Sequence, residues 1–253
     1  MINLLRSEWI KLRTVTMNWV LAIIAVAFPL MVTLLTAYFS GDAAGFNTRD
    51  LTSVLTGTIV VAALLCGVIA AASITSEFGF GTIRPTFAAT PKRVQVIIAK
   101  GVVVVVATTL LATIVVLIGW LAGSNIASGR GATIDLADVP TAVPAMAGAV
   151  VLTAFMSLAG YGFGLITRST PVAVSILIVW PLIAEGLVGA LLSVVTGNDK
   201  IGLWMPFQAG IRLVLIESIG DGGPSRIVAG GYFGAVALGL VALGSWAVNR
   251  RDA

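Results

Sequence analysis

The run VVVVVATTLLATIVVLIGW, residues 102–120, contains no charged residue and decides the class of this protein. It belongs to an apolar stretch over about residues 94–122, longer than the ~20 residues that an α-helix needs to cross a bilayer. In lipid every backbone N–H and C=O must be bonded within the protein, so a helix is the expected conformation. The stretch therefore predicts a membrane-spanning helix.

Five other apolar runs have the same length and character. The six predicted spans cover about residues 17–39, 53–76, 94–122, 141–166, 171–195 and 227–248. Apolar residues make up 58% of the 253 residues and charged residues only 10%, too few to cover a soluble domain. We expect an all-α integral membrane protein with a single domain over residues 1–253. This composition excludes a soluble enzyme and a nucleic-acid-binding domain, so we expect a lipid bilayer and no nucleic acid as partner.

The few charged residues are divided unequally between the two ends of the predicted spans. Ten basic and three acidic residues lie on the side of both termini, and five basic and seven acidic residues lie on the other. Lys and Arg collect on the cytoplasmic side of membrane proteins, so both termini are predicted to be cytoplasmic. Abundant Ala, Val and Gly and an excess of Arg over Lys indicate a bacterial source. We therefore expect the chain in the bacterial cytoplasmic (inner or plasma) membrane.

Small residues recur four positions apart within several predicted spans. The pairs are Gly67 with Ala71, Gly160 with Gly164, Gly186 with Ala190, and Gly230 with Gly234. This spacing lets two helices approach closely in lipid, either within one bundle or between two subunits. We favour packing within the bundle and leave subunit contact open for some pairs.

The segment before the first span is amphipathic. Leu5, Trp9 and Leu12 share one helical face, and Arg13 lies on another. A helix of this kind lies in the membrane interface, with Trp at the depth of the headgroups. We expect either a generic anchor or an elbow that also contacts a cytoplasmic partner.

The first cytoplasmic loop, SEFGFGTIRPTFAATPKR at residues 76–93, carries more structural signals than a plain linker. Gly81 allows a sharp backbone turn, and Thr82 can cap a short helix that ends before Pro91. Phe87 contributes to an apolar side that a monomer has no reason to expose. The loop therefore predicts a short structured helix that contacts either a partner protein or the membrane surface.

These residues resemble the permease subunits of ABC-2 type transporters. The matching pattern is Glu77, Gly81-Thr82-Ile83-Arg84, Pro91-Lys92-Arg93 and Lys100, and residues 7–13 and 203–207 also resemble that family. The resemblance covers essentially the whole chain, including a helical hairpin before the last span.

The resemblance implies a permease that pairs with a second copy or a homologous permease and rests on two ABC ATPase subunits. The first cytoplasmic loop would dock in the ATPase and transmit its movement. Carried over by position, the ATPase-coupling residues are Glu77, Gly81, Thr82, Arg84, Phe87, Pro91 and Arg93. Glu77 could pair with Arg84 or Arg93.

Nothing in the chain predicts ATP hydrolysis or a resident cofactor. It has no Gly-x-x-x-x-Gly-Lys-[Ser/Thr] sequence, so ATP and Mg are expected on the partner subunit. It has no His, and its one Cys, Cys66, lies in an apolar run. We therefore predict no catalytic residue and no metal site, and we interpret the glycines of residues 160–164 as packing residues.

Two features near the fifth span remain open. Glu185 is the one acid well inside a span, and it is either a functional intramembrane carboxylate or a partner in an interhelical hydrogen bond. Pro181, one turn earlier, predicts a kink. For residues 201–219 we favour an amphipathic hairpin or re-entrant segment at the membrane surface over a seventh span.

We expect the permease subunit of an ABC exporter for a hydrophobic or amphipathic cargo, such as an antibiotic, a peptide or a lipid-like molecule. Such an exporter could confer drug resistance. The alternatives are a stand-alone secondary transporter or channel and a membrane enzyme. The first needs several ionisable residues within spans, and the second needs paired catalytic residues there.

Overall fold

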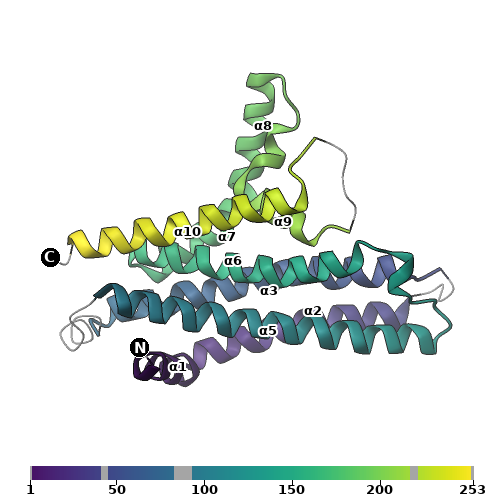
Figure 1. Ribbon diagram of the computed structural model, residues 1–253, viewed down its shortest axis with the longest axis horizontal. Coiled ribbons are helices and arrows are strands. Elements are labelled where there is room, and N and C mark those ends of the chain that lie inside the picture. The colour runs from purple at the N-terminus through teal and green to yellow at the C-terminus, as the bar shows by residue number, and fades with distance from the viewer. Residues whose placement is uncertain (1, 41–44, 83–92, 217–221, 252–253) are drawn as a thin grey trace.

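The computed structural model describes residues 2–40, 45–82, 93–216 and 222–251. Long helices lie side by side in an elongated bundle, and both termini lie at the same end (Figure 1). We call this end the terminal end and the opposite one the distal end. Within the described ranges, six segments are long and apolar enough to cross a membrane, which confirms the predicted all-α architecture with six spans.

Five of the six segments are single uninterrupted helices, and the fifth segment along the chain is broken. The uninterrupted spans are α2 (Thr16–Phe39), α3 (Thr48–Gly79), α5 (Arg93–Gly129), α6 (Ala142–Thr167) and α10 (Arg226–Arg251). The fifth span consists of three consecutive elements: α7 (Thr170–Val179), the π-helical turn η2 (Trp180–Ala184) and α8 (Glu185–Thr196). Shorter elements are α1 (Ile2–Thr14), η1 (Leu136–Asp138), η3 (Ile201–Trp204), α9 (Pro206–Ile211) and η4 (Arg212–Val214).

The helix α3 begins five residues before the predicted span because its first turn is capped. The Asn47 side chain accepts hydrogen bonds from the backbone N–H groups of Arg49 and Asp50, at 2.8 and 3.4 Å. The Asp50 carboxylate accepts one in return from the N–H of Asn47, at 3.1 Å. This reciprocal cap stabilises a polar first turn that hydropathy alone does not indicate.

Glycines bring α3, α6 and α10 close together at the centre of the bundle. A Cβ atom on Gly160 would lie 2.2 Å from the carbonyl oxygen of Gly67, and one on Gly234 would lie 2.8 Å from the Phe155 ring. At Gly160 the obstacle to a side chain is backbone, so the approach requires glycine, whereas at Gly234 a larger residue would have to displace the Phe155 ring. Three of the four small-residue pairs therefore include packing positions within the chain. The exception is the pair that contains Gly186, where nothing lies within 4 Å.

The fifth segment is the main departure from a simple row of spans. Its helix is interrupted at η2, which contains Pro181, and α8 leaves the bundle and projects away from it (Figure 1). A proline removes one backbone hydrogen bond, so a break one turn before Glu185 is the expected response. The sequence predicted the kink and not its direction.

The elements after α8 pack against the helices of the bundle. Phe207 of α9 and Leu213 of η4 are buried, because α9 packs on α10 and η4 packs on α6. A Cβ atom on Gly148 of α6 would lie 2.0 Å from the carbonyl oxygen of Leu213. Residues 206–214 are therefore part of the bundle.

Candidate functional site

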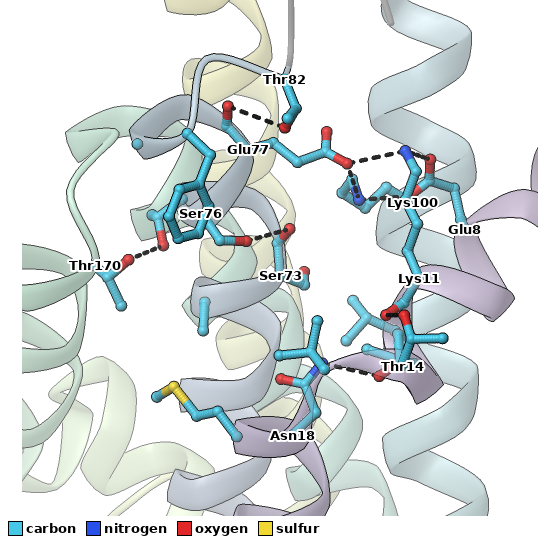
Figure 2. A pocket seen from close by; sticks show the side chains of 18 of the residues that line it. Glu8, Lys11, Thr14, Asn18, Ser73, Ser76, Glu77, Thr82, Lys100 and Thr170 are labelled. Atoms are coloured by element: carbon cyan, nitrogen blue, oxygen red, sulfur yellow. Dashed lines mark hydrogen bonds and ion pairs between the residues drawn. The ribbon is translucent and has the colours of Figure 1, made fainter.

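Four charged side chains meet at the terminal end of the bundle, where three helices come together. Glu8 and Lys11 come from α1, Glu77 from the last turns of α3, and Lys100 from α5; their charged groups point toward one another (Figure 2). We call these four residues the charge cluster.

The ion pairs of the charge cluster form one connected network. Lys11 Nζ lies 2.8 Å from Glu8 Oε1 and 3.0 Å from Glu77 Oε1. Lys100 Nζ lies 3.0 Å from the same oxygen of Glu77 and also pairs with Glu8 Oε2. Each carboxylate therefore has two ammonium partners, and the four formal charges cancel.

Burial makes this network costly to disrupt. Glu8, Glu77 and Lys100 are 2, 7 and 5% exposed, whereas the Lys11 side chain is 44% exposed. A buried charge that loses its partner typically costs about 3–5 kcal/mol, and an exposed pair contributes far less. The three buried members therefore hold α1, α3 and α5 together more strongly than Lys11 does.

The charge cluster shifts the pKa values of its α1 residues. Burial raises the pKa of the Glu8 carboxyl, but the Lys100 and Lys11 ammonium groups lower it more, so this pKa lies below its ordinary value of 4.5. Partial burial lowers the pKa of Lys11, but its bonds to Glu8 and Glu77 raise it more, above the ordinary value of 10.5. Both residues are therefore held in their charged forms at neutral pH.

The turn between α1 and α2 places α1 at this position. Val15 has an extended backbone, and two side chains of α2 bond the free carbonyls at the end of α1. Asn18 Nδ2 donates to the carbonyl of Leu12 at 3.0 Å, and Trp19 Nε1 donates to that of Arg13 at 2.6 Å. These bonds satisfy a helix end at a sharp change of direction.

The four predicted residues of the N-terminal helix α1 differ in exposure. Leu5 and Leu12 are half-buried, with Leu12 packed at the terminal end of the bundle, while Trp9 and Arg13 are exposed. Among the residues of α1 whose side chains the structure describes, Glu8 is the most buried, at 2% exposure. The packed side of α1 is thus centred on a charged residue that the amphipathic pattern did not single out.

The predicted coupling loop begins directly beside the charge cluster. Gly81 has a φ of +69°, the left-handed conformation that glycine adopts readily, and it turns the chain out of α3. Thr82 Oγ1 donates to the carbonyl of Glu77 at 3.5 Å, and Phe80 is 84% exposed. The turn therefore presents an aromatic ring away from the bundle.

Only part of the predicted coupling set can be placed. Arg84, Phe87 and Pro91 lie outside the described residues, and Arg93 is the first residue of α5 with no described side chain. Glu77 pairs with Lys11 and Lys100. The sequence held one signal for each partner. Lys100 lies inside an apolar run, and Lys11 lies on an amphipathic helix.

A cavity of about 1070 Å³ opens beside the charge cluster, between α1, α3, α5 and the start of α7. On its far side Thr75 and Thr170 hydroxyls lie 2.6 Å apart and tie α3 to α7. Nearby, the Arg168 guanidinium lies 4.9 Å from the Phe78 ring centroid. The charge cluster thus borders an open cavity at the terminal end and is not sealed within the apolar core.

Glu185 lies away from this end and bonds backbone groups. Its carboxylate, 1% exposed, accepts hydrogen bonds from the N–H groups of Phe207, at 3.0 Å to each oxygen, and Gln208, at 2.9 Å. Phe207 and Gln208 are in the first turn of α9, whose N–H groups have no partner within the helix. Glu185 therefore joins the root of α8 to the start of α9.

The chain matches the family model described as ABC-2 family transporter protein over residues 4–184, more than half of its length. It belongs to the ABC-2 transporter family. No curated protein and no solved structure matches it. The matched range contains all four residues of the charge cluster, so the site is part of the ABC-2 domain. With its six spans, this ABC-2 protein is a multi-pass membrane protein and a membrane component of a transporter.

Proposed function

We propose that this chain is the permease subunit of an ATP-driven exporter and that a separate ATPase subunit docks at its terminal end. The charge cluster carries the proposal, because it joins α1, α3 and α5 at the point where the predicted coupling loop leaves α3. A permease needs such a junction to convert a push on a loop into a movement of spans.

The geometry supports transmission through both ends of that loop. Glu77 lies just before the loop on α3, and Lys100 lies about two turns into α5 on its other side. Their ion pair at 3.0 Å links the two helices across the loop, and Glu8 adds α1 to the same unit. A displacement of the loop would therefore move the three helices together.

The charge distribution supports a cytoplasmic position for the terminal end. Ten of the basic residues lie on that side, as the positive-inside rule requires for a cytoplasmic face. ATP is available only there, so the ATPase and its ATP and Mg belong to that side. The active transporter would contain two permease copies, as the family resemblance implies, in a bacterial cytoplasmic membrane.

The spans favour an apolar or amphipathic cargo. The hydroxyl groups within them are largely occupied by the helix backbone, as in Thr108 and Thr113, which bond the carbonyls four residues earlier at 2.9 Å. Few polar groups are left to replace the hydration shell of an ion or a sugar. A hydrophobic antibiotic, peptide or lipid-like molecule fits this lining better.

A stand-alone secondary transporter is less well supported. It would need a titratable group in the spans that is available to a coupling ion, and Glu185 is the candidate that the sequence offered. The carboxylate of Glu185 accepts three backbone hydrogen bonds, and both of its oxygens are engaged. Its geometry is that of a helix cap.

The coupling proposal is tested by changing one carboxylate of the charge cluster. We expect Glu77→Gln to reduce the ATP hydrolysis that the permease stimulates in its ATPase partner by about tenfold, the effect of losing ~1.4 kcal/mol of coupling. The assay uses the permease in nanodiscs, purified in complex with the ATPase subunit that is isolated with it from its native membrane. The matched control is Asp138→Asn, an exposed carboxylate at the distal end.

The controls separate coupling from folding. In size-exclusion chromatography the Glu77→Gln permease must elute as an intact complex with the ATPase subunit. The ratio of permease to ATPase must be the same as in the unmodified complex. Equal stimulation by an intact Glu77→Gln complex, or an equal loss with Asp138→Asn, would contradict a coupling role for the charge cluster.

A further inference from the structure

The corner between α6 and α7 contains a residue with an unfavourable backbone conformation. Arg168 follows the last residue of α6, and its φ of 55° is in the left-handed region. In the part of the chain that the structure describes, it is the one non-glycine residue with a positive φ. Its N–H donates to the carbonyl of Gly164 at 2.9 Å and closes the last turn of α6. Glycine usually occupies this capping position, because a Cβ atom disfavours the left-handed conformation.

The side chain of Arg168 makes a contact that offsets this cost. Its guanidinium lies 4.9 Å from the centroid of the Phe78 ring, within the ~6 Å range of a cation–π contact. An anchor at the membrane surface would need only a positive charge. A basic residue in place of Ser169, whose backbone is extended, would supply that charge without strain. The strained backbone of Arg168 therefore accompanies a specific contact with α3, and such strain is typical of functional positions.

Phe78 lies where the predicted coupling loop leaves α3. It follows Glu77 of the charge cluster, and its carbonyl accepts a hydrogen bond from the N–H of Gly81 at 3.3 Å. Gly81 is the residue that turns the chain out of α3. A displacement at the root of the loop therefore reaches Phe78 through this hydrogen bond, and it reaches the α6–α7 corner through the Phe78 ring.

This contact is separate from the links that the charge cluster makes. The ion pairs of the cluster join α1, α3 and α5. The backbones of α6 and α3 approach closely at Gly160 and Gly164, about two turns or more before Phe78 along α3. At the corner itself α3 also meets α7, because the Thr170 and Thr75 hydroxyls lie 2.6 Å apart (Figure 2). The end of α3 thus has its own connection to the fourth and fifth spans.

The corner is short enough to pass a movement from one helix to the next. Helix α6 ends at Thr167 and α7 begins at Thr170, so Arg168 and Ser169 are the whole connection. The φ and ψ angles of two residues then set the angle between the fourth and fifth spans. Conformational changes of proteins are often absorbed by a few such residues between elements.

We propose that Arg168 is a positioning residue that passes the movement of the coupling loop to α6 and α7, by a route through Phe78 that is separate from the charge cluster. The proposal rests on the coupling role proposed above for the loop, and it adds the fourth and fifth spans to the moving unit. The contact with the Phe78 ring holds Arg168 in its left-handed conformation, so a displaced ring changes the angle at the corner.

Cysteine labelling at two matched positions tests this route. In a Cys66→Ala background, which removes the one native cysteine, Val172→Cys reports on the start of α7 and Val94→Cys on the start of α5. The two valines are 48 and 43% exposed. Labelling by a maleimide is timed in the purified complex with the ATPase subunit, with and without ATP and vanadate. We expect nucleotide to change both rates by about fivefold. Arg168→Gly should abolish the change at Val172→Cys and leave the change at Val94→Cys.

Matched variants separate this role from a structural one. Arg168→Gly should not lower the thermal midpoint of the complex, because glycine adopts a φ of 55° readily. Phe78→Leu should cause the same loss of response at Val172→Cys. The double variant should lose no more than either single one, since both changes remove one contact. Phe78→Tyr keeps an aromatic ring and should retain the response.

Three results would overturn the proposal: an unchanged response at Val172→Cys in the Arg168→Gly complex, an equal loss at Val94→Cys, or a loss accompanied by a lower thermal midpoint. If Glu77→Gln still reduced the stimulated ATP hydrolysis in any of these cases, the proposed function would stand and the Arg168 route would not. If nucleotide changed neither rate in the complex without these variants, the coupling loop itself and with it both proposals would be contradicted.

Discussion

Lys100 lies about two turns inside α5, and two carboxylates hold its ammonium group there. The position is unfavourable for an isolated charge, since Lys100 is only 5% exposed. The carboxylates of Glu8 and Glu77 offset this cost. Glu8 precedes Lys100 by 92 positions in the chain, and Glu77 precedes it by 23. A charge cluster of this kind persists only when all of its partners are in place.

The pH dependence of stability follows from the Glu8 carboxylate. Its pKa is lowered by folding, so its contribution is fully present above about pH 4.5 and is lost as pH falls through the lower folded value. The pKa of Lys11 is raised, so its smaller contribution is lost only above about pH 10.5. We expect the thermal midpoint in detergent to change little from these groups between these limits and to fall in acid.

Glu8→Gln provides the matched comparison for this titration. The variant should have a lower midpoint at pH 7, and its midpoint should decrease less than that of the unmodified protein between pH 5 and pH 3. Parallel pH curves for the two proteins would show that Glu8 does not titrate as the charge cluster requires.

At the residue scale the sequence predicted Glu77 but not its partners. Glu77 was identified from its position in a motif. Its contact with Lys100 depends on how α3 packs on α5, and its contact with Lys11 depends on where α1 lies. The turn that places α1 is held by hydrogen bonds from Asn18 and Trp19, which follow no sequence pattern of their own. A lysine within an apolar run, such as Lys100, remains a useful signal, since it requires a nearby carboxylate.

At the scale of elements, the spacing of small residues decides how closely the helices pack. The α3–α6 contact depends on Gly160, whose missing side chain leaves room for the backbone of Gly67. The obstacle to a larger residue is a carbonyl oxygen, which cannot rotate away as a side chain could. Substitution therefore has to separate the two helices.

Gly160→Ala should lower stability by about 1–3 kcal/mol, the usual cost of overpacking a core. Gly239→Ala in α10 is the control, because nothing lies within 4 Å of its added Cβ, and a helix gains about 0.5–1 kcal/mol from this change. Chemical unfolding in detergent, followed by tryptophan fluorescence, measures both. If Gly160→Ala were as stable as Gly239→Ala, the close α3–α6 contact would be wrong.

The helices themselves were largely predictable, and their interruptions were not. Apolar length gave the six spans, while the cap at Asn47 extended α3 beyond the apolar run. Pro181 predicted a break in the fifth span. The projection of α8 could not be predicted, because it depends on the Glu185 contact with α9, whose position is itself set by packing on α10.

At the scale of the whole molecule, the two ends of the bundle differ in charge and in construction. The terminal end holds the charge cluster, the cavity and the turn with the exposed Phe80 ring. The helix α8 projects from the side of the bundle (Figure 1). These features place the surface proposed for the ATPase at the terminal end.

Photo-cross-linking at Phe80 tests the central claim most directly. Replacing Phe80, 84% exposed at the terminal end, with a photoreactive benzoyl-phenylalanine should give an adduct with the ATPase subunit when both are expressed together. The same replacement at Phe39, 71% exposed at the end of α2 toward the distal end, should give no such adduct. An ATPase adduct at Phe39, or none at Phe80 in a complex that hydrolyses ATP, would contradict the account.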